Sequence, residues 1–203
     1  DVYKRQLDGH WFHTYEGGEG NLTRHHAWLM TLIGKKLAAE GKYKEAIEAY
    51  KSGYTFPLCY GEEKNYFAQE SHLGYGLAMA YKADGNKREY EKALKSAMTD
   101  HAAPSEISYF RALAFYEAGE ISAAHALCEE MIEAGKEKIR DKDIPAYYGV
   151  GSPCPCPFEY NFPKINTVKG LILEAFGELG LGRVIEAKEH IAEAKKLDVT
   201  NFA

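Results

Sequence analysis

The chain has 203 residues, enough for one domain with a substantial core or for several stacked helical units, and two independent domains are not expected. Its formal charge of −5, with acidic and basic residues interleaved, offers no basic stripe for a phosphate backbone, which argues against nucleic acid as a partner. No stretch reaches the roughly 18 consecutive apolar residues that a membrane span requires, so we expect a soluble protein.

Residues 1–6 resemble the translated transposase adapter of a DNA sequencing library. Such a scar contributes nothing to the fold, and the natural sequence then begins near Leu7, inside a longer reading frame. We therefore expect the chain to be a fragment of a larger protein.

Residues 7–22 are predicted to form an entry loop before the helices. The loop is rich in glycine and carries aromatic residues, histidines and two carboxylates. Aromatic faces stack on the C–H surfaces of sugars, and carboxylates accept hydrogen bonds from hydroxyl groups, so this composition suits a sugar or polyol site. The alternative is that the glycines form a tight turn and the aromatic rings cover the end of the helical region. The candidate ligand-binding residues of this loop are Trp11, His13, Tyr15, Glu16 and Glu19.

The segment from Leu29 to Pro57 predicts a helical hairpin. Its first helix carries the small residue Gly34, and Gly41 lies in its turn. The second helix carries an apolar stripe with helical spacing: Ala46, Ile47, Tyr50, Gly53 and Tyr54. The order of a small residue, a glycine turn, an aromatic residue, alanine, an aromatic residue and proline resembles the consensus of the tetratricopeptide repeat.

Three further hairpins follow the same pattern, with turn glycines at Gly85, Gly119 and Gly182. Successive turn glycines are 44, 34 and 63 residues apart, and the middle spacing equals the period of the tetratricopeptide family. Small residues at fixed positions let antiparallel helices approach closely. We therefore predict an all-α fold over residues 23–203: an α-solenoid of about four tetratricopeptide-like antiparallel hairpins in a right-handed superhelix, with a concave groove and long non-repeat loops.

The first insertion, about ten residues beyond the family period, lies between the first two hairpins and includes Gly61 to His72. Gln69, His72 and Gly76 are expected on one side of the helix that follows. Two interpretations remain open: this face looks into the groove, or it is solvated, with Glu70 near a helix start where the helix dipole favours a negative charge. The candidate ligand-binding residues of this segment are Lys64, Gln69, Glu70 and His72.

A second insertion, from about 136 to 164, separates the last two hairpins. Its centre, 147–163, is rich in proline and aromatic residues and is predicted to be non-helical. One proline separates Cys154 from Cys156, which does not match the spacing of a zinc half-site. Cys128 lies on an apolar helical stripe and is expected to be a buried free thiol. We expect reduced cysteines, a cytoplasmic location, and neither a metal nor a cofactor.

The chain also resembles the C-terminal region of a family of large bacterial proteins, in which tetratricopeptide helices follow an N-terminal mutarotase-like domain of unknown function. The resemblance covers most of residues 10 to 203 and is carried by three motifs: 12–20, 61–64 with 68–70 and His72, and the aromatic and proline-rich loop before the last hairpin. The family usually has Pro and Trp where this chain has Thr14 and Tyr15, and Gly where it has Glu63. The resemblance implies a shared plan for the loops and assigns no catalytic residue.

Two functions follow from these patterns. The first is a scaffold or binding module for a protein, a peptide or the missing N-terminal domain of the same chain, without catalytic activity. The second is the helical half of a carbohydrate-binding or glycoside-processing protein. In that case one pocket would be lined by Trp11, His13, Glu16, Glu19, Glu70 and His72. The second function requires these side chains to converge, whereas the first predicts a groove without convergent carboxylates.

Overall fold

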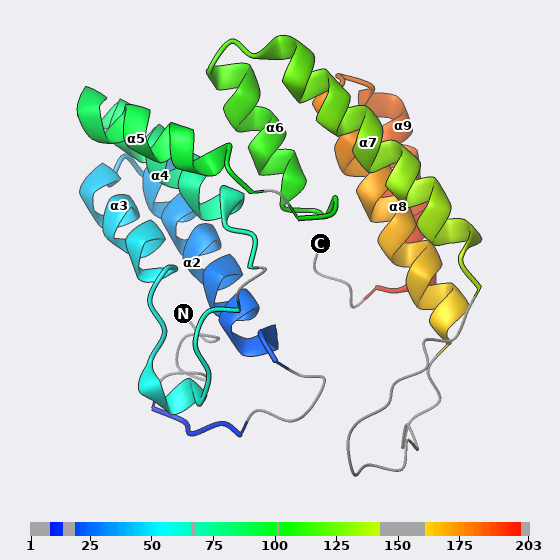
Figure 1. The fold of residues 1–203 in the computed structure, drawn as a ribbon, viewed down its shortest axis with the longest axis horizontal. Coiled ribbons are helices and arrows are strands. Elements are labelled where there is room, and N and C mark those ends of the chain that lie inside the picture. Colours follow the sequence, from blue (N-terminus) through cyan, green and yellow to red (C-terminus); the bar gives the residue numbers. More distant parts are fainter. Residues whose placement is uncertain (1–8, 14–18, 66–67, 101, 143–160, 200–203) are drawn as a thin grey trace. The chain divides into compact units, whose positions relative to one another are not determined.

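The computed structural model describes residues 9–13, 19–65, 68–100, 102–142 and 161–199. Every regular element in these ranges is helical, and Figure 1 shows the path of the chain through them. The elements are α2 (Asn21–Ala39), α3 (Tyr43–Ser52), the short 3-10 helix η1 (Leu58–Tyr60), α4 (Ser71–Ala83), α5 (Lys87–Ala97), α6 (Ser108–Glu117), α7 (Ile121–Arg140), α8 (Phe162–Gly180) and α9 (Val184–Leu197). The predicted all-α class is confirmed for these residues. Within them, no helix has the length and apolar character needed to cross a membrane.

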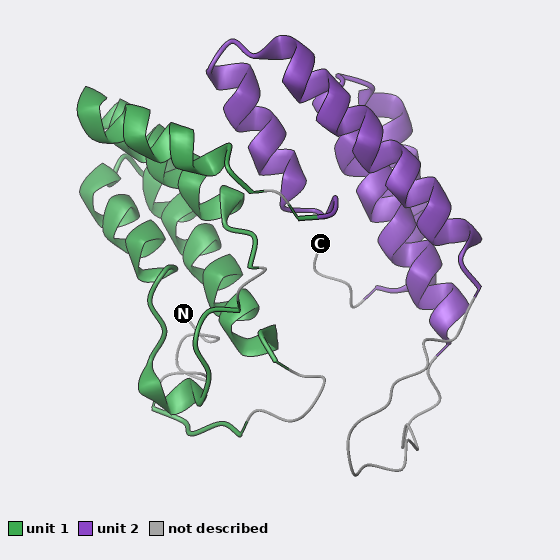
Figure 2. Ribbon diagram, in the orientation of Figure 1, with its two compact units in different colours: residues 1–102 green, residues 103–203 purple. Residues whose placement is uncertain are grey.

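The chain divides into two compact units, residues 1–102 and 103–203, which are coloured separately in Figure 2. In the first unit α2 packs against α3 and α4, α3 also contacts α4, and α4 packs against α5. In the second unit α7 and α8 share the most extensive contact, α6 packs against both, and α9 packs against α8. Each unit is therefore built mainly from helices that pack on their neighbours in sequence.

The helices form four consecutive pairs: α2 with α3, α4 with α5, α6 with α7 and α8 with α9. The turns within these pairs have nearly the same backbone conformation. Each contains a glycine with φ between 75° and 81°: Gly41, Gly85, Gly119 and Gly182. In each turn the N–H after the glycine donates to a carbonyl five positions earlier, over 2.8 to 3.0 Å: Lys42 to Leu37, Asn86 to Tyr81, Glu120 to Phe115 and Arg183 to Glu178. This closure needs the left-handed conformation, which glycine adopts without steric cost.

Small buried residues recur at fixed distances from these turns. Seven residues before the turn glycines lie Gly34, Ala78, Ala112 and Ala175, all of them buried. Five residues after the glycines lie Ala46, Tyr90, Ala124 and Ala187, and the three alanines are buried. In three of the four pairs the helices therefore meet at equivalent small positions, whereas the second pair has Tyr90 in place of the alanine.

In the second unit, glycines bring α7 and α8 into close backbone contact. A Cβ atom added to Gly170 would lie 2.6 Å from the carbonyl oxygen of Gly135. One added to Gly177 would lie 2.6 Å from the carbonyl oxygen of Cys128. Gly170 and Gly177 are seven residues apart and therefore share a helix face. Cys128 is fully buried and has a free thiol, in agreement with its place on a predicted apolar stripe.

The second insertion is shorter than the predicted range of 136–164. α7 continues to Arg140 and α8 begins at Phe162, so both ends of that range are helical. Pro163 is tolerated because the first turn of a helix does not need its N–H, and the Asn161 side chain caps the helix by accepting a hydrogen bond from Lys164 N over 3.0 Å. Residues 1–8, which include the proposed scar, and 143–160, which include Cys154 and Cys156, lie outside the described residues.

Candidate functional site

The entry segment, defined as residues 9–13, is anchored to η1, which in turn contacts α2. The Phe12 N–H donates to the Cys59 carbonyl over 2.9 Å, and the Phe12 ring meets the Tyr60 ring edge-on, with 6.1 Å between their centroids. The Tyr60 hydroxyl lies 3.0 Å from His26 Nδ1, and His26 Nε2 lies 2.9 Å from the Ser52 carbonyl of α3. Because a carbonyl only accepts, His26 Nε2 donates to the Ser52 carbonyl, and in the neutral imidazole Nδ1 then accepts from the Tyr60 hydroxyl.

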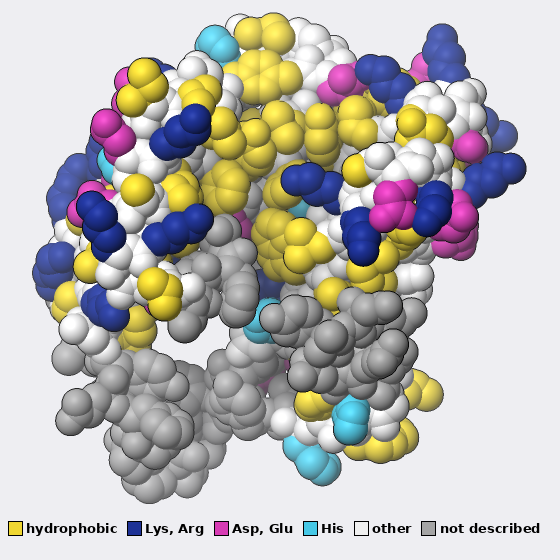
Figure 3. Space-filling model, turned by 180° about the vertical axis from the view of Figure 1, so that it is seen from behind, with side chains coloured by type: hydrophobic (Ala, Val, Ile, Leu, Met, Phe, Trp, Pro, Cys, Tyr) yellow, Lys and Arg dark blue, Asp and Glu magenta, His cyan; other side chains and the backbone are white. Residues whose placement is uncertain are grey.

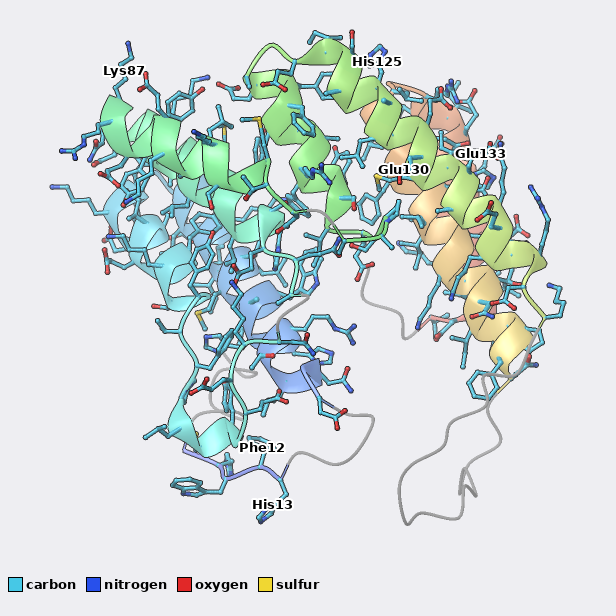
Figure 4. The ribbon with its side chains drawn as sticks, viewed as in Figure 1. Phe12, His13, Lys87, His125, Glu130 and Glu133 are labelled. Atoms are coloured by element: carbon cyan, nitrogen blue, oxygen red, sulfur yellow. The ribbon has the colours of Figure 1, made fainter. Side chains whose placement is uncertain are left out.

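Two predicted ligand-binding residues of the entry segment point into solvent. The Trp11 side chain is 77% exposed, and His13 is also exposed. Figure 4 shows the His13 side chain directed away from the helices. Glu19 is exposed just before α2, whereas Tyr15 and Glu16 lie outside the described residues. The anchored segment therefore exposes an aromatic ring and an imidazole to solvent.

The predicted helix face of Gln69, His72 and Gly76 is wrong in one respect. α4 begins at Ser71, so Gln69 precedes the helix and does not share a helical face with His72. Lys64 Nζ and Glu70 Oε2 form an ion pair at 2.5 Å, next to the helix start. Glu70 is thus close to the N-terminus of α4 as expected, but its carboxylate is directed to a lysine.

Asp100, which follows α5, caps the N-terminus of α4. Its Oδ2 atom accepts hydrogen bonds from the N–H groups of Glu70 and Ser71, each over 2.8 Å, and from Ser71 Oγ over 2.5 Å. The first N–H groups of a helix have no partner within the helix, and the dipole there favours a negative charge. Asp100 therefore joins α4 to the end of α5.

Glu62 performs the same role for α2. Its two carboxylate oxygens accept hydrogen bonds from Gly20 N over 2.9 Å and Thr23 N over 3.1 Å. The first insertion thus supplies a capping carboxylate to a helix that begins about forty residues earlier in the chain. Glu62 and Asp100 are the acidic residues that hold the first helices of the two pairs in this unit.

His72 is the second residue of α4, next to the N-terminus that Asp100 caps. It is only 1% exposed, and its ring lies 4.8 Å from the Trp28 ring, measured between centroids. Burial lowers the pKa of His72 to about 4, although the Asp100 carboxylate opposes this shift. The same surroundings raise the pKa of Tyr54, chiefly through burial and further through the charges of Glu70 and Asp100. Both side chains are therefore neutral near pH 7.

The predicted site residues form two groups in the described part of the chain. Lys64, Glu70 and His72 surround the N-terminus of α4, whereas Trp11 and His13 lie on the entry segment. Within the described residues, no hydrogen bond or ring contact joins Trp11 or His13 to the first group. The described positions also contain no cluster of three or more His, Cys, Asp or Glu residues suited to a metal ion.

Replacing Asp100 with alanine is expected to destabilise the first unit by about 1.5–3 kcal/mol, because two helix N–H groups and the Ser71 hydroxyl lose a charged acceptor. Asp100→Asn keeps an oxygen acceptor and should lose less. Urea unfolding measures the difference. The matched control is Asp84→Ala, an exposed aspartate at the other end of α4. Equal losses for Asp84→Ala and Asp100→Ala would contradict the capping role.

The stability of the first unit is expected to fall as the pH drops from 6.5 towards 4. The folded state resists protonation of His72, because its pKa is lowered from 6.5 to about 4, whereas the unfolded chain takes up the proton. The stabilisation is therefore complete above pH 6.5 and is lost by about 1.4 kcal/mol per pH unit within this window. Urea unfolding of His72→Asn should show a smaller pH slope. His25→Asn, at an exposed position of α2, should keep the slope of the parent chain.

Basic and acidic side chains are interspersed on the surface. Figure 3 shows both signs of charge side by side on the face that it draws. Exposed pairs such as Lys51 with Glu48 and Lys136 with Glu133, at 3.0 and 2.7 Å, illustrate this mixture. Such solvated pairs contribute little to stability.

No family model matches the sequence, and none of the curated proteins matches it. The resemblances to tetratricopeptide repeats and to the mutarotase-associated family therefore stay predictions from the motifs of the chain itself.

Proposed function

We propose that the chain is a binding module of the tetratricopeptide type, a scaffold that holds a protein or peptide partner. The observation that carries this proposal is the fourfold repetition of one turn. Gly41, Gly85, Gly119 and Gly182 share a left-handed conformation and the same hydrogen bond across the turn. Repeated hairpins of this kind bury their apolar faces by stacking, and stacked hairpins present an extended surface to partners.

One partner under this proposal is the N-terminal domain of the longer protein to which the chain belongs. The resemblance to the mutarotase-associated family supports a fragment whose helices bind the N-terminal domain of the same chain. Glu62 ties the first insertion to α2, so this loop has a defined place on the helices. A loop that is fixed to the helices in this way offers a neighbouring domain a defined surface against which to pack.

A peptide selection tests the binding function. Random peptides displayed on phage are selected against the folded chain, and the enriched peptides are titrated into the isotopically labelled chain while its amide NMR signals are followed. The expected result is saturable shifts on one contiguous face of at least two hairpins, with dissociation constants on the order of micromolar. Shifts confined to chain ends, or no saturable peptide, would reject the proposal.

The exposed Trp11 on the anchored entry segment favours a carbohydrate as the second candidate ligand. An exposed aromatic face is suited to stacking on a sugar ring. A glycan array probed with the unsubstituted chain and with Trp11→Ala distinguishes the two functions. Loss of a glycan signal in Trp11→Ala, with no change in Leu32→Ala on exposed α2 surface, would favour the carbohydrate function. The absence of a glycan signal for the unsubstituted chain would reject the carbohydrate function.

A further inference from the structure

The fourth hairpin carries carboxylates at two positions that are mostly apolar in the others. The residues eight positions before the turn glycines are Ile33, Leu77, Arg111 and Glu174. The residues four positions before them are Leu37, Tyr81, Phe115 and Glu178. Glu174 and Glu178 lie one turn apart on the same face of α8. A local break in a repeated apolar pattern is a common sign of a functional adaptation.

The two carboxylates are buried at the contact between α8 and its neighbours. Glu174 is only 6% exposed. Glu178 Oε2 lies 2.9 Å from His190 Nδ1 on α9. The site of an added Cβ on Gly135 of α7 lies 2.6 Å from Glu174 Cγ, so α7 encloses Glu174 from the other side.

Charged and titratable groups face Glu174 from each of these elements. Glu178 lies on its own helix and His190 on α9, whereas Lys136 and Glu133 come from α7. Lys136 and Glu133 also pair with each other at 2.7 Å, so Lys136 is not wholly available to Glu174. His190 is therefore the group that can best offset the negative charge of the two buried carboxylates, and it is positive only when protonated.

We propose that the contact between α8 and α9 is a proton-sensitive joint, which holds α9 more tightly at mildly acidic than at alkaline pH. When Glu174 is protonated, it adds no charge beside Glu178, and Glu178 keeps its contact with His190 of α9 at 2.9 Å. When Glu174 is ionised at higher pH, two buried carboxylates one helical turn apart repel each other. The apolar contacts of Leu171 and Ile172 with Ala194 persist in both states, so α9 loosens without the unit unfolding.

The direction of the pH effect follows from Glu174. Burial is the main cause that raises its pKa, Glu178 and Glu133 raise it further, and His190 and Lys136 oppose them. A carboxyl group with a raised folded pKa contributes stability that is complete below its unfolded pKa of 4.5 and is lost as the pH rises through the folded value. The joint does not require the proposed binding function, so it can be tested on the isolated chain.

Hydrogen exchange of the α9 amides tests the joint. Protection factors, corrected for intrinsic exchange, are measured between about pH 5 and pH 8 on the full chain. The protection of α9 is expected to fall as the pH rises, by about tenfold for each unit by which folding raises the pKa of Glu174. In Glu174→Gln, which is neutral at every pH, the protection should stay near its acidic value. The exposed control on α9, Glu193→Gln, should keep the pH dependence of the parent.

A second variant tests the contact of His190 with Glu178 separately from the effect of Glu174. His190→Gln removes the imidazole that pairs with Glu178, so it should lower α9 protection and leave the fall with rising pH in place, because Glu174 is unchanged. Protection of α9 that is independent of pH in the parent, or an unchanged slope in Glu174→Gln, would overturn the proposal. Loss of protection throughout α7 and α8 in Glu174→Gln would also overturn it, because it would mean that Glu174 stabilises the whole unit.

Discussion

Replacing Gly170 with alanine is expected to destabilise the second unit, although alanine is the better helix former. The added Cβ would lie 2.6 Å from the Gly135 carbonyl oxygen and 3.1 Å from the Ile139 nitrogen. Both are backbone atoms of α7, so relief requires the helices to move apart. Overpacking of this kind costs about 1–3 kcal/mol or more, which exceeds the gain of roughly 0.5–1 kcal/mol from removing a helical glycine. Gly177→Ala should behave in the same way, because its Cβ would meet the Cys128 carbonyl oxygen.

The measurement must report on the second unit alone, because two units need not unfold together. Hydrogen exchange of the α7 and α8 amides meets this requirement. Lys169→Ala, at the exposed neighbouring position of α8, is the control and should change stability by less than about 0.5 kcal/mol. A gain in protection for Gly170→Ala, as expected for an ordinary helical glycine, would mean that α7 and α8 are farther apart than described.

The turns were predictable from sequence because their chemistry is local. Gly41, Gly85, Gly119 and Gly182 were each expected at a turn, and each has the positive φ that only glycine adopts freely. The helix pairs follow from 3.6-residue spacing, which is also a local signal. The predicted end of the second insertion, at about 164, is wrong, because a proline such as Pro163 breaks a helix interior but suits a first turn.

The contacts around the candidate site were not predictable, because they join residues far apart in sequence. Asp100 reaches the start of α4 from about thirty residues later in the chain, and no local pattern marks it as a cap. The chemistry of His72 makes it a candidate ligand-binding residue, yet its burial against Trp28 is a tertiary property. The close approach of α7 and α8 spans the second insertion, so the glycines of the two helices cannot be paired from spacing alone.

Replacing Tyr50 with alanine should cost the first unit about 3–5 kcal/mol, the range for deleting a buried aromatic side chain. Tyr50 of α3 is almost fully buried, and its ring lies between two glycines of neighbouring helices. A Cβ atom on Gly34 of α2 would lie 2.7 Å from Tyr50 Cζ, and one on Gly76 of α4 would overlap Tyr50 Cε1. Burial raises the pKa of Tyr50 to about 12, so the hydroxyl is neutral near pH 7 and Tyr50→Phe should retain most of the stability.

A double-mutant cycle determines whether Tyr50 and Gly76 fit together as described. Gly76→Ala alone should destabilise the unit, because the new Cβ overlaps the Tyr50 ring. In the Tyr50→Ala background the ring is gone and the methyl group enters the vacated space, so the same change should cost little or should stabilise. Urea unfolding of the four chains gives the coupling energy, expected to be about 1–3 kcal/mol for residues in contact. Additive effects would contradict the contact, since two substitutions that share no space act independently.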